Sequence, residues 1–314
     1  MVTILFTRHY DMLTEHHIKT IESLSEDIHV LVEENVLDVI GEVDILIAGK
    51  FDAQILQKAT KLKWVHALAA GVDRLLFPEF VNSPIMLTNS SGVHPIPISE
   101  HVLGIMLMFT RGFHESMRSQ FQKKWERSTP SELYGKTLGI VGFGSIGERV
   151  GQLGKCCGMR VIGLKRNVDY ATASADEILP PDNLDILLGQ SDFVVISLPL
   201  TPQTTHYISL KELKKMKNTA YFINISRGKT VKQADLIHAL QSGIIQGTGL
   251  DVFEEESLPP DSPLWEMKNV IITPHYAGST PEYFNRAISI FCNNLEQYLK
   301  GEPLLNLVDK KRGY

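Results

Sequence analysis

The sequence is poor in cysteine and has no long apolar run. Only 3 cysteines occur among its 314 residues, and two of them, Cys156 and Cys157, are adjacent, while the third is Cys292. An odd count with this spacing argues against a disulfide framework and against a metal site, and it favours buried thiols in a reducing cytoplasm. The longest apolar run, residues 102–109, is far shorter than the roughly 20 residues that span a bilayer, so we expect no membrane segment.

An excess of positive charge is missing as well. The formal net charge is -5, which provides no basic field for binding nucleic acid. The first residues, MVTILF, lack the basic stretch and long apolar core of a secretory signal and resemble a short buried strand instead. We therefore expect a cytoplasmic protein whose partner is a small molecule.

The length and the pattern of apolar runs predict two α/β domains. A chain of 314 residues exceeds the roughly 250–300 residues at which a single hydrophobic core stops growing. In the first part, strand-like runs alternate with helical stretches, which predicts a parallel sheet of flavodoxin-like type. The expected strands are residues 2–6, 28–32, 43–48, 62–67 and 85–88. A long helix should follow over residues 98–118, with Ser99 as a cap near its start.

The alternation begins again at Thr137 and predicts a doubly wound sheet of six parallel strands. The expected strands are residues 138–141, 160–164, 193–198, 220–225, 247–252 and 270–272. Apolar residues at helical spacing then predict a helix over residues 281–299, which should return to the first domain.

A glycine-rich segment lies between the strand expected at 138–141 and a helical stretch. Gly142, Gly144 and Gly147 form a GxGxxG pattern. The first glycine permits a tight turn, the second lets a pyrophosphate approach the backbone, and the third lets helix and strand pack closely. We predict a phosphate-binding turn to which Ser145 adds a hydroxyl; the alternative is a turn without a ligand.

Residues 99–283 would form a dinucleotide-binding domain, and residues 1–98 with 284–314 a substrate domain.

Three polar residues follow strand-like runs of the second domain. Arg227, Glu256 and His275 come after the runs that end near residues 225, 252 and 272. They should converge, because ligands bind at the carboxyl ends of strands in open α/β sheets. A planar guanidinium suits a substrate carboxylate, and a carboxylate beside an imidazole favours the protonated ring, which can donate a proton to a carbonyl oxygen. The alternatives are a surface arginine and a loop histidine with a packing role.

These residues belong to a longer series of motifs. In chain order the motifs are AAGVD at 69–73, ISEHVLG at 98–104, GFGSIG at 142–147, LPLTP at 198–202, NISRG at 224–228, LDVFEEE at 250–256 and TPH at 273–275. On these motifs the chain resembles the D-isomer-specific 2-hydroxyacid dehydrogenase family, and glyoxylate/hydroxypyruvate reductases in particular, over nearly its whole length. The resemblance implies an NAD(P)-dependent oxidoreductase that reduces small 2-keto acids to D-2-hydroxy acids.

The resemblance also implies a role for individual residues. Arg227 would bind the substrate carboxylate and carbonyl, and His275, supported by Glu256, would be the general acid in reduction and the base in oxidation. The backbone around Ala70, Gly71 and Val72 would hold the substrate carboxylate. The implied cofactor residues are Gly142, Gly144, Ser145, Ile146, Gly147, Lys165, Arg166, Leu198, Pro199, Ile225, Ser226, Arg227, Asp251, His275, Ala277 and Gly278. Asp251 would contact the nicotinamide amide.

Family resemblance further implies a homodimer built on the dinucleotide-binding domain. Trp125 lies in a segment that would face the dimer partner, where it either reaches the partner's pocket or packs in the interface. The apolar stretch at 98–109 supports the same expectation. The departures from the family pattern are few: Ser257 stands where proline is usual, and Tyr276 and Ala277 replace a smaller or glycine-containing pair. Neither removes a catalytic group, although Tyr276 could narrow the pocket.

The end of the expected strand at 160–164 bears on the choice of cofactor. NAD-specific folds place an acidic residue about 20 positions beyond the glycine turn, where it binds the ribose 2′-hydroxyl. Here Lys165 and Arg166 occupy that neighbourhood, and Asp169 could serve only if the loop bent back. Two cations suit a 2′-phosphate, so we predict a preference for NADP(H), with NAD(H) also possible. The alternative is that both cations face solvent and either cofactor is accepted. No metal site is expected.

Other functions stay open at this point. One is a dinucleotide-sensing interaction protein, because transcriptional corepressors are built on a similar fold; the complete set of Arg227, Glu256 and His275 argues against it. Another is a phosphoglycerate dehydrogenase of the short form, because a chain that ends at Tyr314 has no room for the regulatory domain of the longer forms. Formate dehydrogenases resemble the chain less, because they typically carry glutamine where Glu256 stands.

Overall fold

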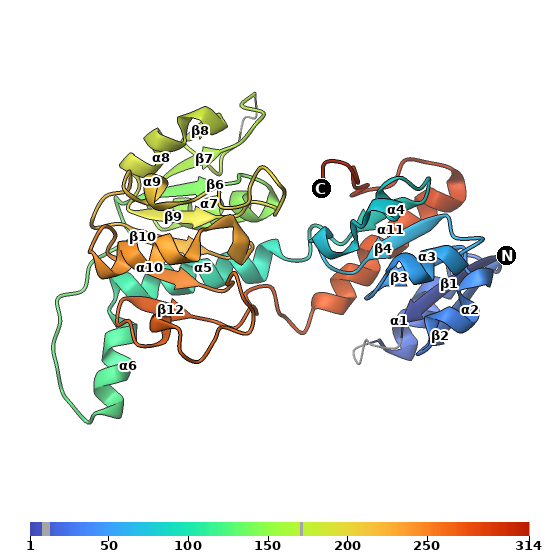
Figure 1. The fold of residues 1–314 in the computed structure, drawn as a ribbon, viewed down its shortest axis with the longest axis horizontal. Coiled ribbons are helices and arrows are strands. Elements are labelled where there is room, and N and C mark those ends of the chain that lie inside the picture. Colours follow the sequence, from blue (N-terminus) through green and yellow to red (C-terminus); the bar gives the residue numbers. More distant parts are fainter. Residues whose placement is uncertain (8–12, 170–171, 314) are drawn as a thin grey trace. The chain divides into compact units, whose positions relative to one another are not determined.

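The computed structural model describes residues 1–7, 13–169 and 172–313. The chain divides into two compact units (Figure 1). The first unit comprises Met1–Val93 and Thr280–Tyr314, and the second comprises His94–Ser279. The sequence suggested divisions after residues 98 and 283, a few positions beyond those in the structure. We describe each unit by itself.

A parallel sheet of five strands in the order β2-β1-β3-β4-β5 forms the first unit. Its strands are β1 (Val2–Thr7), β2 (Ile28–Glu33), β3 (Ile45–Ala48), β4 (Trp64–Ala67) and β5 (Met86–Asn89). This is the flavodoxin-like order that the sequence predicts. β3 and β4 are buried along their whole length, which explains why their sequences are continuous apolar runs rather than alternating ones.

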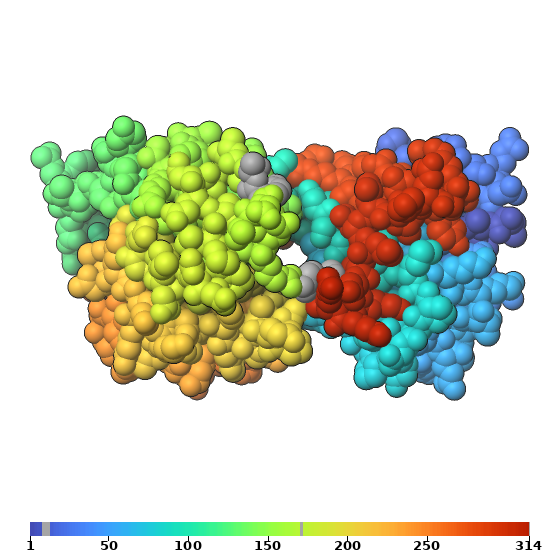
Figure 2. Space-filling model, turned by 90° about the horizontal axis from the view of Figure 1, so that it is seen from above, coloured from blue at the N-terminus to red at the C-terminus, as the bar shows by residue number. Residues whose placement is uncertain are grey.

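Short helices and one long helix complete the first unit. The short ones are α1 (Glu15–Glu22), α2 (Val36–Val39), η1 (Ile40–Glu42), α3 (Ala53–Lys58), η2 (Asp73–Leu75) and α4 (Pro78–Val81). The long one is α11 (Tyr283–Lys300), which ends at Gly301 with a left-handed φ of 71°. Phe291 and Leu295 of α11 lie in one core cluster with Ile4 and Phe6 of β1. The C-terminal segment therefore completes the core of the first unit. On the surface shown in Figure 2, the red atoms of this segment lie beside the cyan and blue atoms of the same unit.

The second unit contains a parallel sheet of seven strands in the order β12-β11-β10-β9-β6-β7-β8. Its strands are β6 (Thr137–Val141), β7 (Arg160–Leu164), β8 (Glu177–Leu179), β9 (Phe193–Ile196), β10 (Tyr221–Asn224), β11 (Gly247–Leu250) and β12 (Val270–Ile272). Its helices are α5 (Pro95–Thr110), α6 (Phe113–Phe121), α7 (Ser145–Cys156), η3 (Pro181–Asn183), α8 (Leu184–Gln190), α9 (Leu210–Leu213), η4 (Gly228–Thr230), α10 (Gln233–Gln241) and η5 (Pro263–Trp265). The chain order along the sheet reverses between β6 and β9, which is the doubly wound arrangement.

Two predictions for the second unit were incomplete. The sheet has a seventh strand, β8, that the sequence did not predict, because this short edge strand begins with a charged residue and only one of its three residues is buried. The helix expected over 98–118 is two helices, α5 and α6, which are separated at Gly112, where φ is 67°. Ser99 is not a cap, because α5 begins four residues earlier at Pro95 and the Ser99 hydroxyl donates to the carbonyl of Ile96 within the helix.

The cysteines also differ from expectation. All three are free thiols, but Cys156 is exposed and Cys157 is half-buried, so only Cys292 is a buried thiol. Cys156 is the last residue of α7, and Cys157 is the residue that caps its C-terminus. Within the described residues, no helix combines the length and the apolar character needed to cross a membrane.

Candidate active site

The glycine turn joins β6 to α7, and the space around its three glycines differs. A Cβ atom on Gly142 would lie 2.5 Å from the carbonyl oxygen of Ser197, and one on Gly147 would lie 2.5 Å from that of Gly142. The chain's own packing therefore requires both glycines. A Cβ on Gly144 would meet nothing within 4 Å. Open space at the second glycine, beside the start of α7, fits a pyrophosphate that approaches the backbone.

Other residues assigned to the cofactor lie around this turn or at the same sheet edge. Leu198 follows β9, and its Cδ2 atom is 3.1 Å from the position of a Cβ on Gly142. Lys165 and Arg166 directly follow β7; the first is half-buried and the second is exposed. Asp169 is exposed two residues beyond Asn167, whose side chain accepts a hydrogen bond from the Asp169 amide at 3.1 Å. The acidic residue typical of NAD-specific folds is thus absent from the end of β7 itself.

Arg227 follows β10 in a loop fixed by hydrogen bonds. The Arg227 carbonyl accepts from the side chains of Asn224, at 3.2 Å, and Thr230, at 2.6 Å. The next residue, Gly228, packs against the backbone of the loop after β11, because a Cβ there would lie 1.8 Å from the carbonyl carbon of Phe253. This contact holds the loop of Arg227 against the loop that carries Glu256.

Glu256 and His275 form a direct pair. The Nδ1 of His275 donates to Oε2 of Glu256 at 2.8 Å, because an ionised carboxylate can only accept. Its other oxygen, Oε1, accepts from the amide of Phe253 at 3.2 Å. The imidazole side chain is 45% exposed and the carboxylate side chain 30% exposed, so a small ligand can reach the pair. The Nε2 atom of His275 is the position at which a proton would be given or taken.

A buried carboxylate anchors the loop that carries the histidine. Asp251 is 2% exposed, and its oxygens accept from the amides of Tyr276, at 3.1 Å, and Ala277, at 3.0 Å, and from the hydroxyl of Thr273, at 2.6 Å. Its carbonyl accepts from the amide of His275 at 2.9 Å. Sequence patterns could not indicate this structural role, because it depends on one hydroxyl and several backbone amides that lie 22 to 26 residues away.

Two further histidines lie in this part of the second unit. The ring of His94 packs against Gly278, where a Cβ would lie 2.6 Å from its Cδ2 atom. Burial, and then the charge of Arg227, lower the pKa of His94. His206 pairs with Glu254 at 2.8 Å, and the Gln233 amide donates to the same carboxylate oxygen of Glu254 at 3.2 Å. Sequence analysis singled out neither histidine, because each lies farther from the end of an expected strand than Arg227, Glu256 or His275 does.

Tyr276 is 49% exposed and lies edge-on to His101, with ring centroids 5.7 Å apart. It therefore stands at the surface of the second unit beside His275.

In the first unit, Val72 is buried, whereas Gly71 is exposed and Ala70 is half-buried. Trp125 is 91% exposed.

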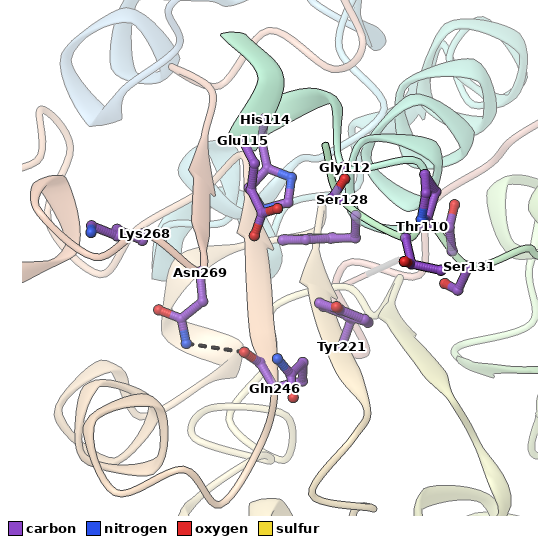
Figure 3. A pocket seen from close by; sticks show the side chains of 13 residues that line it. Thr110, Gly112, His114, Glu115, Ser128, Ser131, Tyr221, Gln246, Lys268 and Asn269 are labelled. Carbon is purple, nitrogen blue, oxygen red and sulfur yellow. Dashed lines mark hydrogen bonds between the residues drawn. The ribbon is translucent and has the colours of Figure 1, made fainter. Parts of the chain in front are cut away.

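A pocket of about 260 Å³ lies elsewhere in the second unit (Figure 3). It is lined by residues that precede or begin strands, namely Tyr221, Gln246 and Asn269, and by His114 and Ser128 from the α6 region. The Asn269 side chain donates to the carbonyl of Gln246 at 3.0 Å across its wall. Arg227, Glu256 and His275 follow the same strands at their carboxyl ends, so this pocket is not their site.

Comparison of the sequence with known proteins identifies the family of the chain. The model for the NAD binding domain of D-isomer specific 2-hydroxyacid dehydrogenases matches residues 103–277. The chain belongs to the D-isomer specific 2-hydroxyacid dehydrogenase family. This confirms the family expected from the sequence and, at that level, the expectation of an NAD(P)-dependent dehydrogenase.

Relatives and solved structures agree with this assignment. A glyoxylate reductase of Korarchaeum cryptofilum is 36% identical over 85% of the chain and 82% of its own length. A D-3-phosphoglycerate dehydrogenase of Methanocaldococcus jannaschii is 34% identical over 98% of the chain, which spans 60% of that relative's length. The NADPH-dependent glyoxylate/hydroxypyruvate reductase of Sinorhizobium meliloti, solved with NADP and sulfate, is 26% identical with a TM-score of 0.84 and covers all of both chains. These likenesses confirm the predicted two-domain α/β fold class.

Proposed function

We propose that this dehydrogenase reduces small 2-keto acids, such as glyoxylate or hydroxypyruvate, to D-2-hydroxy acids with NADPH. The observation that carries the proposal is the 2.8 Å pair between Glu256 and His275, on loops that follow neighbouring strands of the dinucleotide-type sheet. The pair provides a proton donor with a fixed orientation at an exposed position. The glyoxylate reductases among the relatives support this choice of substrate class.

The chain's own residues bind, orient and protonate the substrate. A nicotinamide dinucleotide, when bound, supplies the hydride for the keto carbon, and Gly142, Gly144 and Gly147 fit its pyrophosphate. His275 holds the proton at Nε2 and donates it to the carbonyl oxygen, while Glu256 keeps Nδ1 protonated and orients the ring. The guanidinium of Arg227 stabilises the charge that develops on that oxygen and binds the substrate carboxylate.

In the first unit, the backbone around Ala70, Gly71 and Val72 is our candidate for holding the substrate carboxylate. The protein would act as a homodimer built on the second unit, with Trp125 in the dimer-facing segment.

Asp251 and the neighbouring Ala277 and Gly278 are candidates for the nicotinamide side, although the Asp251 carboxylate already receives three hydrogen bonds from its own chain. One acceptor position on Oδ2 is then available for an amide.

We further propose a preference for NADPH over NADH. Lys165 and Arg166 directly follow β7, where an NAD-specific fold would carry a carboxylate. Their charge suits a 2′-phosphate and would not be repelled by it. The NADPH dependence stated for the Sinorhizobium meliloti reductase supports the same preference. Replacement of Arg166 by aspartate should shift the ratio of kcat/KM values toward NADH, and a wild-type enzyme with a higher kcat/KM for NADH would contradict the proposal.

The function is tested by a panel of rate measurements with NADPH and NADH in parallel. The panel contains glyoxylate, hydroxypyruvate and branched 2-keto acids, with D-3-phosphoglycerate oxidation included because of the Methanocaldococcus jannaschii relative. We expect the highest kcat/KM with a small keto acid and NADPH. Turnover of D-3-phosphoglycerate alone would assign the enzyme to a different reaction, and no turnover of any keto acid would refute the proposal.

A further inference from the structure

The loop that follows β4 in the first unit is held by its carbonyl groups. The Ala67 carbonyl accepts from the amide of Ser90 at 3.1 Å and from its hydroxyl at 3.3 Å. The Leu68 carbonyl accepts from the hydroxyl of Tyr283, which begins α11. The Ala69 carbonyl accepts from the amide of Ser90 at 3.3 Å, and the Ala70 carbonyl accepts from Nδ2 of Asn89 at 2.7 Å. Four consecutive carbonyls are thus bound by the end of β5 and the start of α11.

This arrangement determines where the amides of the loop point. In a trans peptide the carbonyl of one residue and the N–H of the next lie in one plane and point in opposite directions. With the carbonyls of Leu68, Ala69 and Ala70 turned toward β5 and α11, the N–H groups of Ala69, Ala70 and Gly71 are turned away from both. A row of successive amides with one orientation suits a carboxylate. Ala69 and Gly71 are exposed, which leaves that side of the loop open.

Ser90 is fixed by a buried network behind it. Oγ1 of Thr88 lies 2.8 Å from the indole nitrogen of Trp64 and 2.7 Å from Nδ1 of His66, and Nε2 of His66 lies 3.1 Å from the Ser90 hydroxyl oxygen. An indole N–H only donates and a carbonyl only accepts. All contacts are satisfied when Trp64 donates to Thr88, Thr88 to His66, His66 to Ser90, and Ser90 to the carbonyl of Ala67. Complete burial lowers the pKa of His66 to about 3, which keeps the ring neutral in this role.

The other two donors are fixed as well. Asn89 is 7% exposed, and its Oδ1 accepts from the amide of Ser91 at 3.1 Å, so that its NH₂ group faces the Ala70 carbonyl. Burial raises the pKa of Tyr283 to about 12, so its hydroxyl keeps its proton and remains a donor. Both donors lie on regular elements, at the last residue of β5 and the first residue of α11.

We propose that Asn89, Ser90 and Tyr283, with His66 behind Ser90, are positioning residues that set the affinity for the substrate carboxylate. They do not touch the substrate; they keep the amides of Ala69, Ala70 and Gly71 oriented toward it. The inference rests on the proposed function, which assigns the carboxylate to this loop. Without a donor, the corresponding peptide plane can rotate and its N–H no longer points to the anion. Binding then weakens while proton donation by His275 is unaffected.

The test uses the full-length protein and single substitutions that remove one donor each. Tyr283→Phe removes only a hydroxyl, and Asn89→Ala removes the amide. The matched control for the first is Tyr298→Phe, on the same helix, and for the second Asn294→Ala, a fully buried asparagine whose side chain bonds to Leu305 rather than to this loop. Steady-state rates with the preferred keto acid and calorimetric titration with oxalate, a dicarboxylate probe, are measured for all variants.

We expect KM for the keto acid and the Kd of oxalate to rise about tenfold in Tyr283→Phe and Asn89→Ala. Each variant would lose the hydrogen bond from one loop amide to the carboxylate, and a tenfold change is of the order expected for one such bond. The kcat and the Kd of NADPH should stay within about twofold of wild type, since a positioning effect on ground-state binding changes KM alone. His66→Gln, which can still accept from Thr88 and donate to Ser90, should preserve KM better than His66→Leu. The controls should keep wild-type KM even where Asn294→Ala lowers the unfolding temperature.

Two results would separate the failure of this inference from that of the proposed function. An active enzyme in which Tyr283→Phe and Asn89→Ala keep wild-type values of KM and oxalate Kd would overturn the role of these donors. A wild-type enzyme that reduces no keto acid would refute the proposed function. In that case weaker oxalate binding by Tyr283→Phe would still support an anion site in the loop, and unchanged oxalate binding would overturn it.

Discussion

The backbone of His275 adopts a conformation that is uncommon for its residue type. Its φ of 51° lies in the left-handed region, which costs a non-glycine residue about 1–3 kcal/mol. Hydrogen bonds from this segment to the buried carboxylate of Asp251 offset that cost. The direction of Nδ1 toward Glu256 therefore depends on the loop and not only on the side chain.

Removal of the proposed catalytic groups should abolish chemistry and leave cofactor binding intact. We expect His275→Ala to lower kcat by about 10²–10⁴-fold, the usual contribution of a general acid, and Arg227→Ala to lower kcat/KM by a comparable factor. The Kd of NADPH should hardly change, because the glycine turn is not altered. His238→Ala, an exposed histidine on α10, serves as the control. Near-normal keto-acid reduction by His275→Ala or by Arg227→Ala would contradict the mechanism.

His66 should make the stability of the protein depend on pH below 6.5, starting above the range in which carboxylates titrate. Its pKa is lowered from 6.5 to about 3 by burial, so the unfolded chain binds a proton that the folded chain does not. Stability is then fully present above pH 6.5 and is lost as the pH falls toward 3. The free energy of unfolding should decrease by up to about 1.4 kcal/mol per pH unit on acidification.

Denaturant unfolding of wild type and His66→Gln at pH 7.0, 6.0 and 5.5 checks this dependence. Burial lowers the pKa of His94 and His101 as well, and both stay in the variant. The difference between the two proteins therefore isolates His66. We expect the unfolding free energy of the variant to fall less steeply with decreasing pH. Parallel curves would show that burial of His66 does not govern the acid side of the profile.

Gly228 lies where the loop of Arg227 packs against the loop that carries Glu256. Replacing it with alanine would place a Cβ 1.8 Å from the carbonyl carbon of Phe253, which only a shift of the backbone can relieve. We expect a loss of about 1–3 kcal/mol in unfolding free energy, and a fall in kcat/KM of about 10²-fold, because Arg227 and Glu256 would move apart.

Gly189→Ala on α8 is the matched control for this substitution. Its Cβ would lie 3.7 Å from the nearest atom, the carbonyl oxygen of Lys215, which is ordinary van der Waals contact. Because this glycine is inside a helix, alanine should stabilise the protein by a few tenths of a kcal/mol to about 1 kcal/mol. A Gly228→Ala enzyme with normal kcat/KM would show that the relative position of the two loops is not critical.

The elements that sequence patterns predict well are those whose burial is uniform. β3 and β9 are continuous apolar runs that are buried along their whole length. The carboxyl ends of β10, β11 and β12, expected near residues 225, 252 and 272, lie at Asn224, Leu250 and Ile272. That was sufficient to choose Arg227, Glu256 and His275 as candidate catalytic residues. β8 begins with a charged residue and has only one buried residue, and the break between α5 and α6 depends on one glycine, so neither gave a clear signal.

The supporting contacts could not be predicted from the sequence for a different reason. Asp251 binds amides of a loop more than twenty residues later, and Asn89 binds a carbonyl 19 residues earlier. Such contacts depend on the path of the backbone in loops, which carries no periodicity. The identity of a side chain indicates its chemistry, and the fold determines which backbone group it meets.

Helix α6 carries an apolar stripe that its own unit leaves exposed. Phe113, Met117 and Phe121 are spaced four residues apart, so they lie on one face of the helix, and they are 51%, 51% and 83% exposed. Trp125, 91% exposed, follows in the same segment. Monomeric soluble proteins rarely leave large contiguous apolar patches in water, which favours a second copy of the chain as the cover.

We therefore expect a homodimer in solution that depends on this stripe. Light scattering at micromolar concentration should give twice the 35.2 kDa mass of the chain. The double substitution of Met117 and Phe121 by glutamate should shift the equilibrium toward monomer, because it introduces charges where the partner would exclude water. Ile186→Glu on α8, a residue that is 46% exposed in the same unit, should leave the mass unchanged. A monomeric wild-type mass, or a double variant that stays dimeric, would show that α6 does not form the interface.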